Sequence, residues 1–167
     1  MTALNPATLT ALAVFPQLLR EHFEAVPPEY RHWAPPSWEG VPSEPLTALE
    51  QLCHVRDIEV EGYQLRFVRT LREDRPLLAS LDTETLAHER EYGRADAHEV
   101  LAAFAEARAG TVRMLAGLAP AQLARRAEFE GYGPVSLRAL VHFLCSHDQQ
   151  HLAGLQWLIG KVEGLDG

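Results

Sequence analysis

Apolar residues recur at intervals of three and four along four long stretches of the chain, and this spacing predicts four amphipathic helices. We expect these helices over residues 6–26, 47–71, 96–118 and 136–159. No segment between them has the alternating pattern of a confident strand. The pattern therefore predicts an all-α fold, a four-helix bundle formed by a single domain over residues 1–167.

The residue types at the expected helix ends support these limits. Thr47 and Glu50 have the spacing of a capping box, Ser136 can cap the fourth helix, and Gly160 should end it. Pro16 lies inside the first helix and implies a kink or a new helix start at that point.

Long connections between the helices are typical of a bundle with crossovers. Residues 27–45 hold six of the eleven prolines and cannot form a helix, so we expect Trp33 and Trp38 to hold this crossover against the bundle. Another long connection precedes residue 96, and Asp82 can cap a short turn within it.

The fourth helix presents two histidines to the bundle interior. Residues four apart on a helix share a face, with Cβ atoms ~5–6 Å apart, so His147 and His151 can bind one metal ion. Burial of an imidazole without a partner costs ~1–3 kcal/mol, which favours a shared metal over two isolated core histidines. Both belong to a core-facing stripe with alternating spacings of three and four, namely Leu137, Leu140, Leu144, His147, His151, Gly154 and Leu158.

A metal site needs at least one more protein ligand from another helix, and His54 is the candidate. His54 flanks the apolar stripe of the helix over 47–71. Periodicity therefore leaves two interpretations open, a metal ligand or a boundary histidine with its ring half in water.

Two familiar metal motifs fit this sequence poorly. The segment HDQQH over 147–151 has the histidine spacing of the zinc-protease motif H-E-x-x-H, but aspartate stands where the catalytic glutamate should be. A ferritin-like di-iron site needs two E-x-x-H pairs on helices, whereas the only such pair here, Glu29 and His32, lies in the proline-rich crossover.

Other polar residues have weaker claims to the site. Asp57 lies one turn beyond His54 and could hydrogen-bond a ligand imidazole, whereas Asp148 is expected to face solvent. Arg108 could hold a substrate carboxylate, although a surface arginine that extends its head to water is the favoured interpretation.

His142 points to a different face from His147 and is interpreted as structural. Cys53 and Cys145 fall within apolar helical patterns, so we expect packed side chains and not nucleophiles.

Composition excludes several classes of protein. The chain has 15 basic and 23 acidic side chains, a net charge of −8, which argues against a nucleic-acid partner. Its longest apolar runs are much shorter than the ~18 residues of a membrane span. Without a basic leader or disulfide-like cysteine spacing, the sequence predicts a cytoplasmic protein.

These features together resemble the DinB/YfiT-like superfamily of metal-dependent enzymes. The matching stretches are residues 38–61 (WEGVPSEPLTALEQLCHVRDIEVE) and 136–157 (SLRALVHFLCSHDQQHLAGLQW). The resemblance implies that His54, His147 and His151 are the metal ligands, with zinc or nickel as the usual ion. It also implies a homodimer, because bundles of this family commonly pair through helix faces.

The resemblance leaves the reaction open. The family includes isomerases and transferases that use a low-molecular-weight thiol such as mycothiol, bacillithiol or glutathione, and it favours that chemistry on a small-molecule substrate. The sequence itself is equally consistent with a hydrolase whose metal activates water. The alternative is a non-catalytic, stress-related bundle protein with a structural metal. A pocket that opens onto the histidines would favour an enzyme, whereas a closed coordination shell would favour a structural site.

His147→Ala or His151→Ala should abolish metal binding and leave the helical content largely intact, because a chain of this length buries a sufficient core without a metal. Elemental analysis and circular dichroism check the two expectations. His142→Ala is the control and should retain the ion. Loss of the ion in His142→Ala, with retention in His147→Ala, would show that the assumed helix register is wrong.

Overall fold

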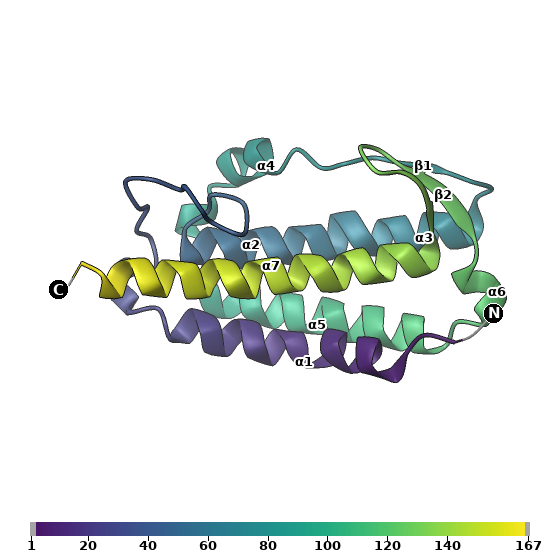
Figure 1. Cartoon of the computed structure of the whole chain (residues 1–167), viewed down its shortest axis with the longest axis horizontal. Coiled ribbons are helices and arrows are strands. Elements are labelled where there is room, and N and C mark those ends of the chain that lie inside the picture. The colour runs from purple at the N-terminus through teal and green to yellow at the C-terminus, as the bar shows by residue number, and fades with distance from the viewer. Residues whose placement is uncertain (1–2, 166–167) are drawn as a thin grey trace.

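The structure, a computed structural model, describes residues 3–165. Four long helices run side by side in it (Figure 1). The first, third and fourth of these helices are α1 (Pro6–Glu24), α5 (Ala97–Ala116) and α7 (Leu137–Glu163). The second long helix begins with α2 (Ala48–Asp57). α1 packs on α5 and α7, and α2 packs on the same two helices, so α1 and α2 occupy opposite corners. The predicted four-helix bundle is confirmed. No helix among the described residues is long and apolar enough to cross a membrane.

The second helix is continuous over residues 48–72 but changes its hydrogen-bonding pattern in the middle. α2 leads into a π-helical segment (Ile58–Gln64), which α3 (Leu65–Arg72) continues. The predicted capping box is present at its start: the Thr47 hydroxyl accepts from the Glu50 amide at 3.4 Å, and the Glu50 carboxylate accepts from the Thr47 amide at 2.8 Å. This cap fixes where the helix begins and hence where the preceding residues lie.

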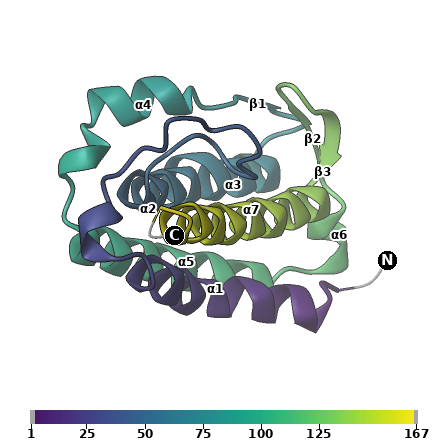
Figure 2. The same cartoon turned by 60° about the vertical axis from the view of Figure 1, so that its left-hand side comes forward.

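The first crossover, residues 25–47, contains the short 3₁₀-helix Pro28–Tyr30 and lies beside α2 and α7 (Figure 2). Trp38 stacks on Trp157 of α7 with ring centroids 6.0 Å apart, and Trp33 packs against the core. The two tryptophans therefore hold the crossover as predicted.

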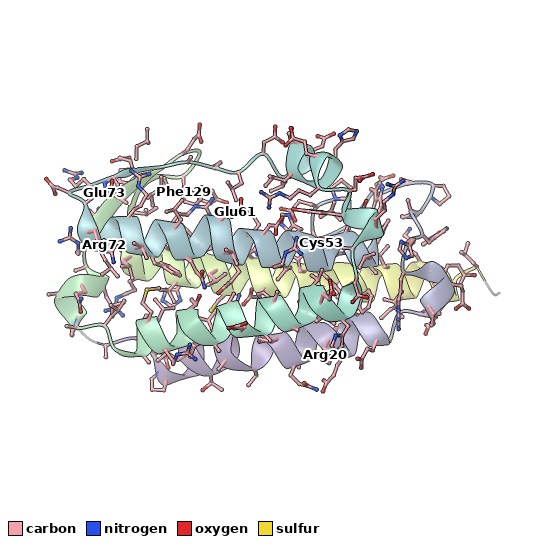
Figure 3. All side chains as sticks on the ribbon, turned by 180° about the vertical axis from the view of Figure 1, so that it is seen from behind. Arg20, Cys53, Glu61, Arg72, Glu73 and Phe129 are labelled. Carbon is pink, nitrogen blue, oxygen red and sulfur yellow. The ribbon has the colours of Figure 1, made fainter. Side chains whose placement is uncertain are left out.

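The second connection, residues 73–96, carries α4 (Thr83–Glu89) and the 3₁₀-helix Tyr92–Arg94. Asp82 caps α4 as expected, since its carboxylate accepts from the Thr85 amide at 3.0 Å. Arg90 then anchors the connection by ion pairs to Asp57 (2.7 Å) and Glu61 (2.8 Å). Figure 3 shows Glu61 on the edge of the second helix nearest the segment with α4.

A small sheet corrects the expectation that no strands would form. β1 (Leu77–Leu78) pairs in parallel with β2 (Arg126–Phe129), which follows α6 (Pro120–Leu123) and pairs antiparallel with β3 (Gly133–Ser136). β1 has only two residues, and Gly133 and Pro134 are strand breakers, so no local pattern marked these strands. The pairing of β1 with β2 joins residues about fifty apart, whereas β2 and β3 form a local hairpin.

Two further expectations, the end of α7 at Gly160 and a new helix start at Pro16, need correction. α7 does not end at Gly160 but continues to Glu163, because one glycine costs only about 1 kcal/mol and the buried Val162 packs the last turn against the core. α1 runs through Pro16 without a new helix start.

The interior consists of two apolar cores with a polar layer between them. One core lies around Phe23, Leu49 and Leu158, and the other around Phe67 and Leu137. In α2 and its π-segment, α5 and α7, buried polar residues separate the positions that belong to the two cores. We refer to the following residues as the polar layer: His54, Glu59, Arg108, Thr111, His147, Asp148 and His151.

Gly154 allows the first crossover to approach α7. A Cβ at this position would stand 2.9 Å from the Cβ of Ser43 and 2.8 Å from Oε1 of Gln51, closer than real contacts allow. Gly154→Ala should therefore lower the free energy of unfolding by about 1–3 kcal/mol, measured by urea denaturation. Gly160→Ala is the matched control in the same helix, because nothing lies within 4 Å of its Cβ, and it should raise stability slightly. Equal stability of the two variants would contradict the close approach.

Candidate metal centre

Four side chains bring potential metal-binding atoms together in the middle of the bundle. Glu44 comes from the first crossover, His54 from α2, and His147 and His151 from α7, and their donor atoms all lie within 4.8 Å of one another. The Nε2 atoms of His54 and His147 are 3.0 Å apart. Nε2 of His151 lies 3.1 Å from Oε2 of Glu44. The structure thus gathers the three histidines selected from the sequence and adds a carboxylate.

Burial settles the position of His54. Its side chain is 1% exposed, so it is a core residue and not a boundary histidine. His151 is completely buried, whereas His147 is partly exposed and Glu44 is 37% exposed. Glu44 therefore lies at the solvent side of the cluster. It was missed because it lies in a crossover without periodicity, three residues before the cap of α2.

The donor atoms fit a divalent ion. Nε2 of His151 and Oε2 of Glu44 are buried and make no hydrogen bond within the described part of the chain. Ligand atoms at ~2.0–2.2 Å from a tetrahedral ion are roughly 3.3–3.6 Å apart. The Nε2 atoms of His54 and His147 are 3.0 Å apart, and the oxygens of Glu44 lie 3.1 Å from His151 and 3.6 Å from His54, so Glu44 is also within reach of an ion bound by the histidines. A shared ion would satisfy the buried atoms that the protein leaves unpaired.

Gln51 sets the proton arrangement of His151. The ring Nδ1 lies 3.1 Å from Oε1 of Gln51, so this nitrogen carries the proton and donates it to the amide oxygen. Nε2 is then unprotonated and faces Glu44. Such support of a ligand imidazole through its other ring nitrogen is usual in metal sites. Gln51 is itself held by a hydrogen bond from its amide nitrogen to the carbonyl of Leu46 at 3.4 Å.

Electrostatics keep the cluster ready to bind a cation. Burial, together with the neighbouring His151, lowers the pKa of His54 to about 4. Burial also lowers the pKa of His147, and His151 and His54 lower it further. For Glu44, burial raises the pKa, whereas a hydrogen bond from His151 and the positive charges of His54 and His151, when these rings are protonated, lower it below the usual range. When the imidazoles are neutral, a bound cation would supply that positive charge instead. Neutral imidazoles and an ionised carboxylate are the forms that bind metals.

Asp57 does not join the cluster. Its carboxylate accepts from Arg56 at 2.8 Å, from Arg90 at 2.7 Å and from the Tyr92 hydroxyl at 2.6 Å. Through Arg90 and Tyr92, Asp57 attaches the connection over residues 73–96 to the second helix.

The expectations for Asp148 and Arg108 were wrong. Asp148 is 2% exposed and Arg108 is 1% exposed, and they form an ion pair inside the bundle. Asp148 is buried because α7 is in contact with α1, α2 and α3, so more than one side of α7 faces the interior. Arg108 continues an inward stripe of α5 with spacings of three and four, and this stripe was a usable signal: Leu101, Phe104, Arg108, Thr111 and Leu115.

The remaining candidates lie where the sequence placed them. His142 is exposed on a different face of α7 from His147. Cys53 is buried and Cys145 half-buried, and burial raises the pKa of each thiol to about 11. Thiols with so high a pKa are not nucleophiles near neutral pH.

A cavity of about 380 Å³ adjoins the cluster on the side of Glu44. It lies between the end of the first crossover and α4, so the second connection supplies its outer wall. Its lining combines apolar groups with two carboxylates: Glu44, Pro45, Leu46, Thr83, Glu84 and Ala87.

The metal-free protein should lose stability as the pH falls from about 6.5 to 4. An unfolded His54 takes up a proton near its ordinary pKa of 6.5, whereas the folded protein resists protonation until about pH 4. The stabilisation is complete above this window and lost below it, and the difference corresponds to roughly 3 kcal/mol. Urea denaturation of chelator-treated protein across this window measures it.

His54→Gln is the control for this pH dependence. Burial raises the pKa of Asp148 to about 6, which acts in the opposite direction, but this contribution is common to both proteins. The stability difference between the wild type and His54→Gln should therefore change over the window. Parallel curves would contradict the low pKa of His54.

Comparison with known proteins agrees with this architecture. The model of the DinB superfamily matches residues 11–155. No curated protein sequence matches the chain. Among solved structures, YfiT from Bacillus subtilis is similar, with a TM-score of 0.83 and 18% identity over 98% of this chain and 92% of that one. YfiT is described as a probable metal-dependent hydrolase with an unusual four-helix bundle topology, and the likeness shows a shared fold. The match over most of its length shows that the chain belongs to the DinB superfamily.

Proposed function

We propose that this protein is a metal-dependent hydrolase of a small-molecule substrate, with a divalent ion, zinc or nickel, bound by His54, His147 and His151. The observation that supports this most is the position of Glu44. Its carboxylate lies between the buried imidazoles and the adjoining cavity, with one oxygen 3.1 Å from His151 and the other 3.6 Å from His54. A carboxylate at the solvent side of a histidine cluster is placed to accept a proton during hydrolysis.

The ion, when bound, would polarise a substrate oxygen and lower the pKa of water toward ~7. The protein's own groups supply the rest of the chemistry. Glu44 is ionised and can take a proton from water that enters through the cavity. Gln51 keeps the Nδ1 proton on His151, which leaves Nε2 directed at the ion. Residues of α4 cover the cavity from the outside and limit the size of the substrate.

Two other functions remain as outcomes of the experiment. A thiol-dependent transferase or isomerase would need a thiol cofactor, because the protein's own cysteines have raised pKa values. A non-catalytic, stress-related metal-binding protein would have a closed shell, and the cavity beside the cluster is lined by Glu44 but by none of the three histidines, so the assays decide between these functions. We further propose a homodimer, since Val60 and Leu65 leave apolar surface exposed on the second helix. The cytoplasmic location stays the prediction made from the lack of a basic leader and of disulfide-like cysteine spacing.

Elemental analysis of the purified protein comes first, followed by two assays of the metal-loaded form. Hydrolysis of p-nitrophenyl acetate tests the proposed reaction. Monochlorobimane with glutathione, bacillithiol or mycothiol tests thiol transfer. Hydrolysis above the metal-free background supports the proposal, thiol transfer alone replaces it with the transferase function, and bound metal without either activity favours the non-catalytic protein.

Glu44→Gln should retain the metal but lower the rate of ester hydrolysis by about 10²–10⁴-fold, the usual contribution of a general base. Metal content and kcat are measured on the same preparation. His147→Ala is the comparison variant and should lose both the ion and the activity. If Glu44→Gln loses the ion as completely as His147→Ala, the carboxylate is an essential ligand and the proposed division of roles is wrong.

A further inference from the structure

Arg108 is an ion-paired arginine in the centre of the bundle. Its Nη1 donates to Oδ2 of Asp148 at 2.7 Å, and its Nη2 donates to Oδ1 of the same carboxylate at 2.9 Å. Nη2 also donates to Glu59 at 2.8 Å, and the Thr111 hydroxyl donates to the other oxygen of that carboxylate. Arg108, Glu59 and Asp148 are each no more than 2% exposed. The arrangement is a network of buried charges in which Nη1 and Nη2 of Arg108 are paired, whereas its buried Nε has no hydrogen-bond partner among the described residues.

The network also reaches α1 and leaves Arg108 little freedom. Pro16 has no amide hydrogen, so the carbonyl of Leu12 lacks its usual helical partner, and Nη1 of Arg108 donates to it at 3.3 Å. The rings of Phe15 and Phe104 flank the guanidinium at 5.2 and 5.0 Å. Arg108 is thus held from all four long helices.

Stability alone is a poor explanation for this network. Removal of charges from water costs several kcal/mol per ion, and apolar residues of similar volume often serve stability equally well. What the network provides is orientation, because a two-pronged contact between guanidinium and carboxylate has one geometry. The two carboxylates that accept from Arg108 lie on the second helix and on α7, which carry the three candidate histidine ligands.

The sequence positions connect the network to the metal centre. Asp148 directly follows His147 on α7, and Glu59 lies in the π-helical segment five residues after His54. A helix with its side chains has a radius of ~5–6 Å, so a ~20° rotation of α7 would move a ring nitrogen by ~2 Å. Metal–ligand distances tolerate only ~0.2 Å. The rotation of these two helices must therefore be fixed for the histidines to share an ion.

We propose that Arg108 is a positioning residue for the metal centre: by binding Glu59 and Asp148 at once, it sets the rotation of both helices and holds His54 and His147 at ligand distance. This inference rests on the proposed metal site. The hydrogen bonds of Arg108 go to Glu59, Asp148 and the carbonyl of Leu12, so it acts on the histidines through the two carboxylates.

Arg108→Lys tests the proposal, because lysine keeps the positive charge but cannot make the two-pronged contact. The matched control is Arg90→Lys, since Arg90 also pairs with two carboxylates of the second helix, Asp57 and Glu61, on its outer side. Co²⁺ is the probe, and its visible absorption reports coordination geometry. We expect Arg108→Lys to weaken Co²⁺ binding by about 10–100-fold and to alter the spectrum, and Arg90→Lys to do neither.

A second measurement needs no metal. Imidazole nitrogen–proton correlation spectra of the chelator-treated proteins should show displaced His54 and His147 signals in Arg108→Lys, with the signals of exposed His142 unchanged. If Arg108→Lys unfolds at the assay temperature, Asp148→Asn provides the same comparison with a smaller change. Wild-type binding and wild-type imidazole signals in a folded Arg108→Lys or Asp148→Asn variant would overturn the inference. Failure of the wild type to bind Co²⁺ would reject the metal site, while the imidazole spectra would still decide the role of Arg108.

Discussion

The arrangement of the bundle depends on one buried guanidinium and the two carboxylates that it joins. None of these charges is tolerable alone, because an unpaired ion in an apolar interior costs several kcal/mol even after relaxation. Arg108 comes from α5, Asp148 from α7 and Glu59 from the π-helical segment, so the helices must come together in one register for all three to be satisfied. A shift of one helix would leave a charge unpaired, and apolar packing by itself imposes no such penalty.

This network lies between two apolar cores, so the residues that stabilise the fold are different from those that can bind a metal. The cores on either side bury most of the large side chains. The polar layer can therefore contain potential metal-binding atoms without a hydrogen-bond partner, such as Nε2 of His151. Burial of such atoms costs free energy, which a bundle with less apolar burial could not offset. The same layer holds the ion-pair network and the histidine cluster, which explains how a rigid set of charges comes to lie directly behind a candidate metal centre.

The sequence predicted the segments whose apolar residues recur with a helical period, and it failed on segments without such a period. Spacings of three and four located the helices, and they placed His147 and His151 on the inner face of α7. Glu44 had no such signal, because the crossover is ordered by tryptophan packing and the capping box. Asp148 was missed for another reason: charged residues are usually exposed, and only a partner on a different helix makes burial acceptable. β1 likewise depends on a contact with a distant segment, since it pairs with β2 about fifty residues further along the chain.

The division between helices and connections also bears on substrate choice. The three histidines lie on long helices, whose positions the cores and the polar layer fix. The cavity beside Glu44 is bounded instead by the first crossover and by α4, and Arg90 attaches the α4 connection to Asp57 and Glu61 at the surface of the second helix. Changes in these segments, apart from Glu44, can reshape the cavity without disturbing the histidines. On the proposed function, a superfamily that shares one bundle can therefore serve different substrates, and the residues that select the substrate of this protein belong to residues 45–46 and 83–87.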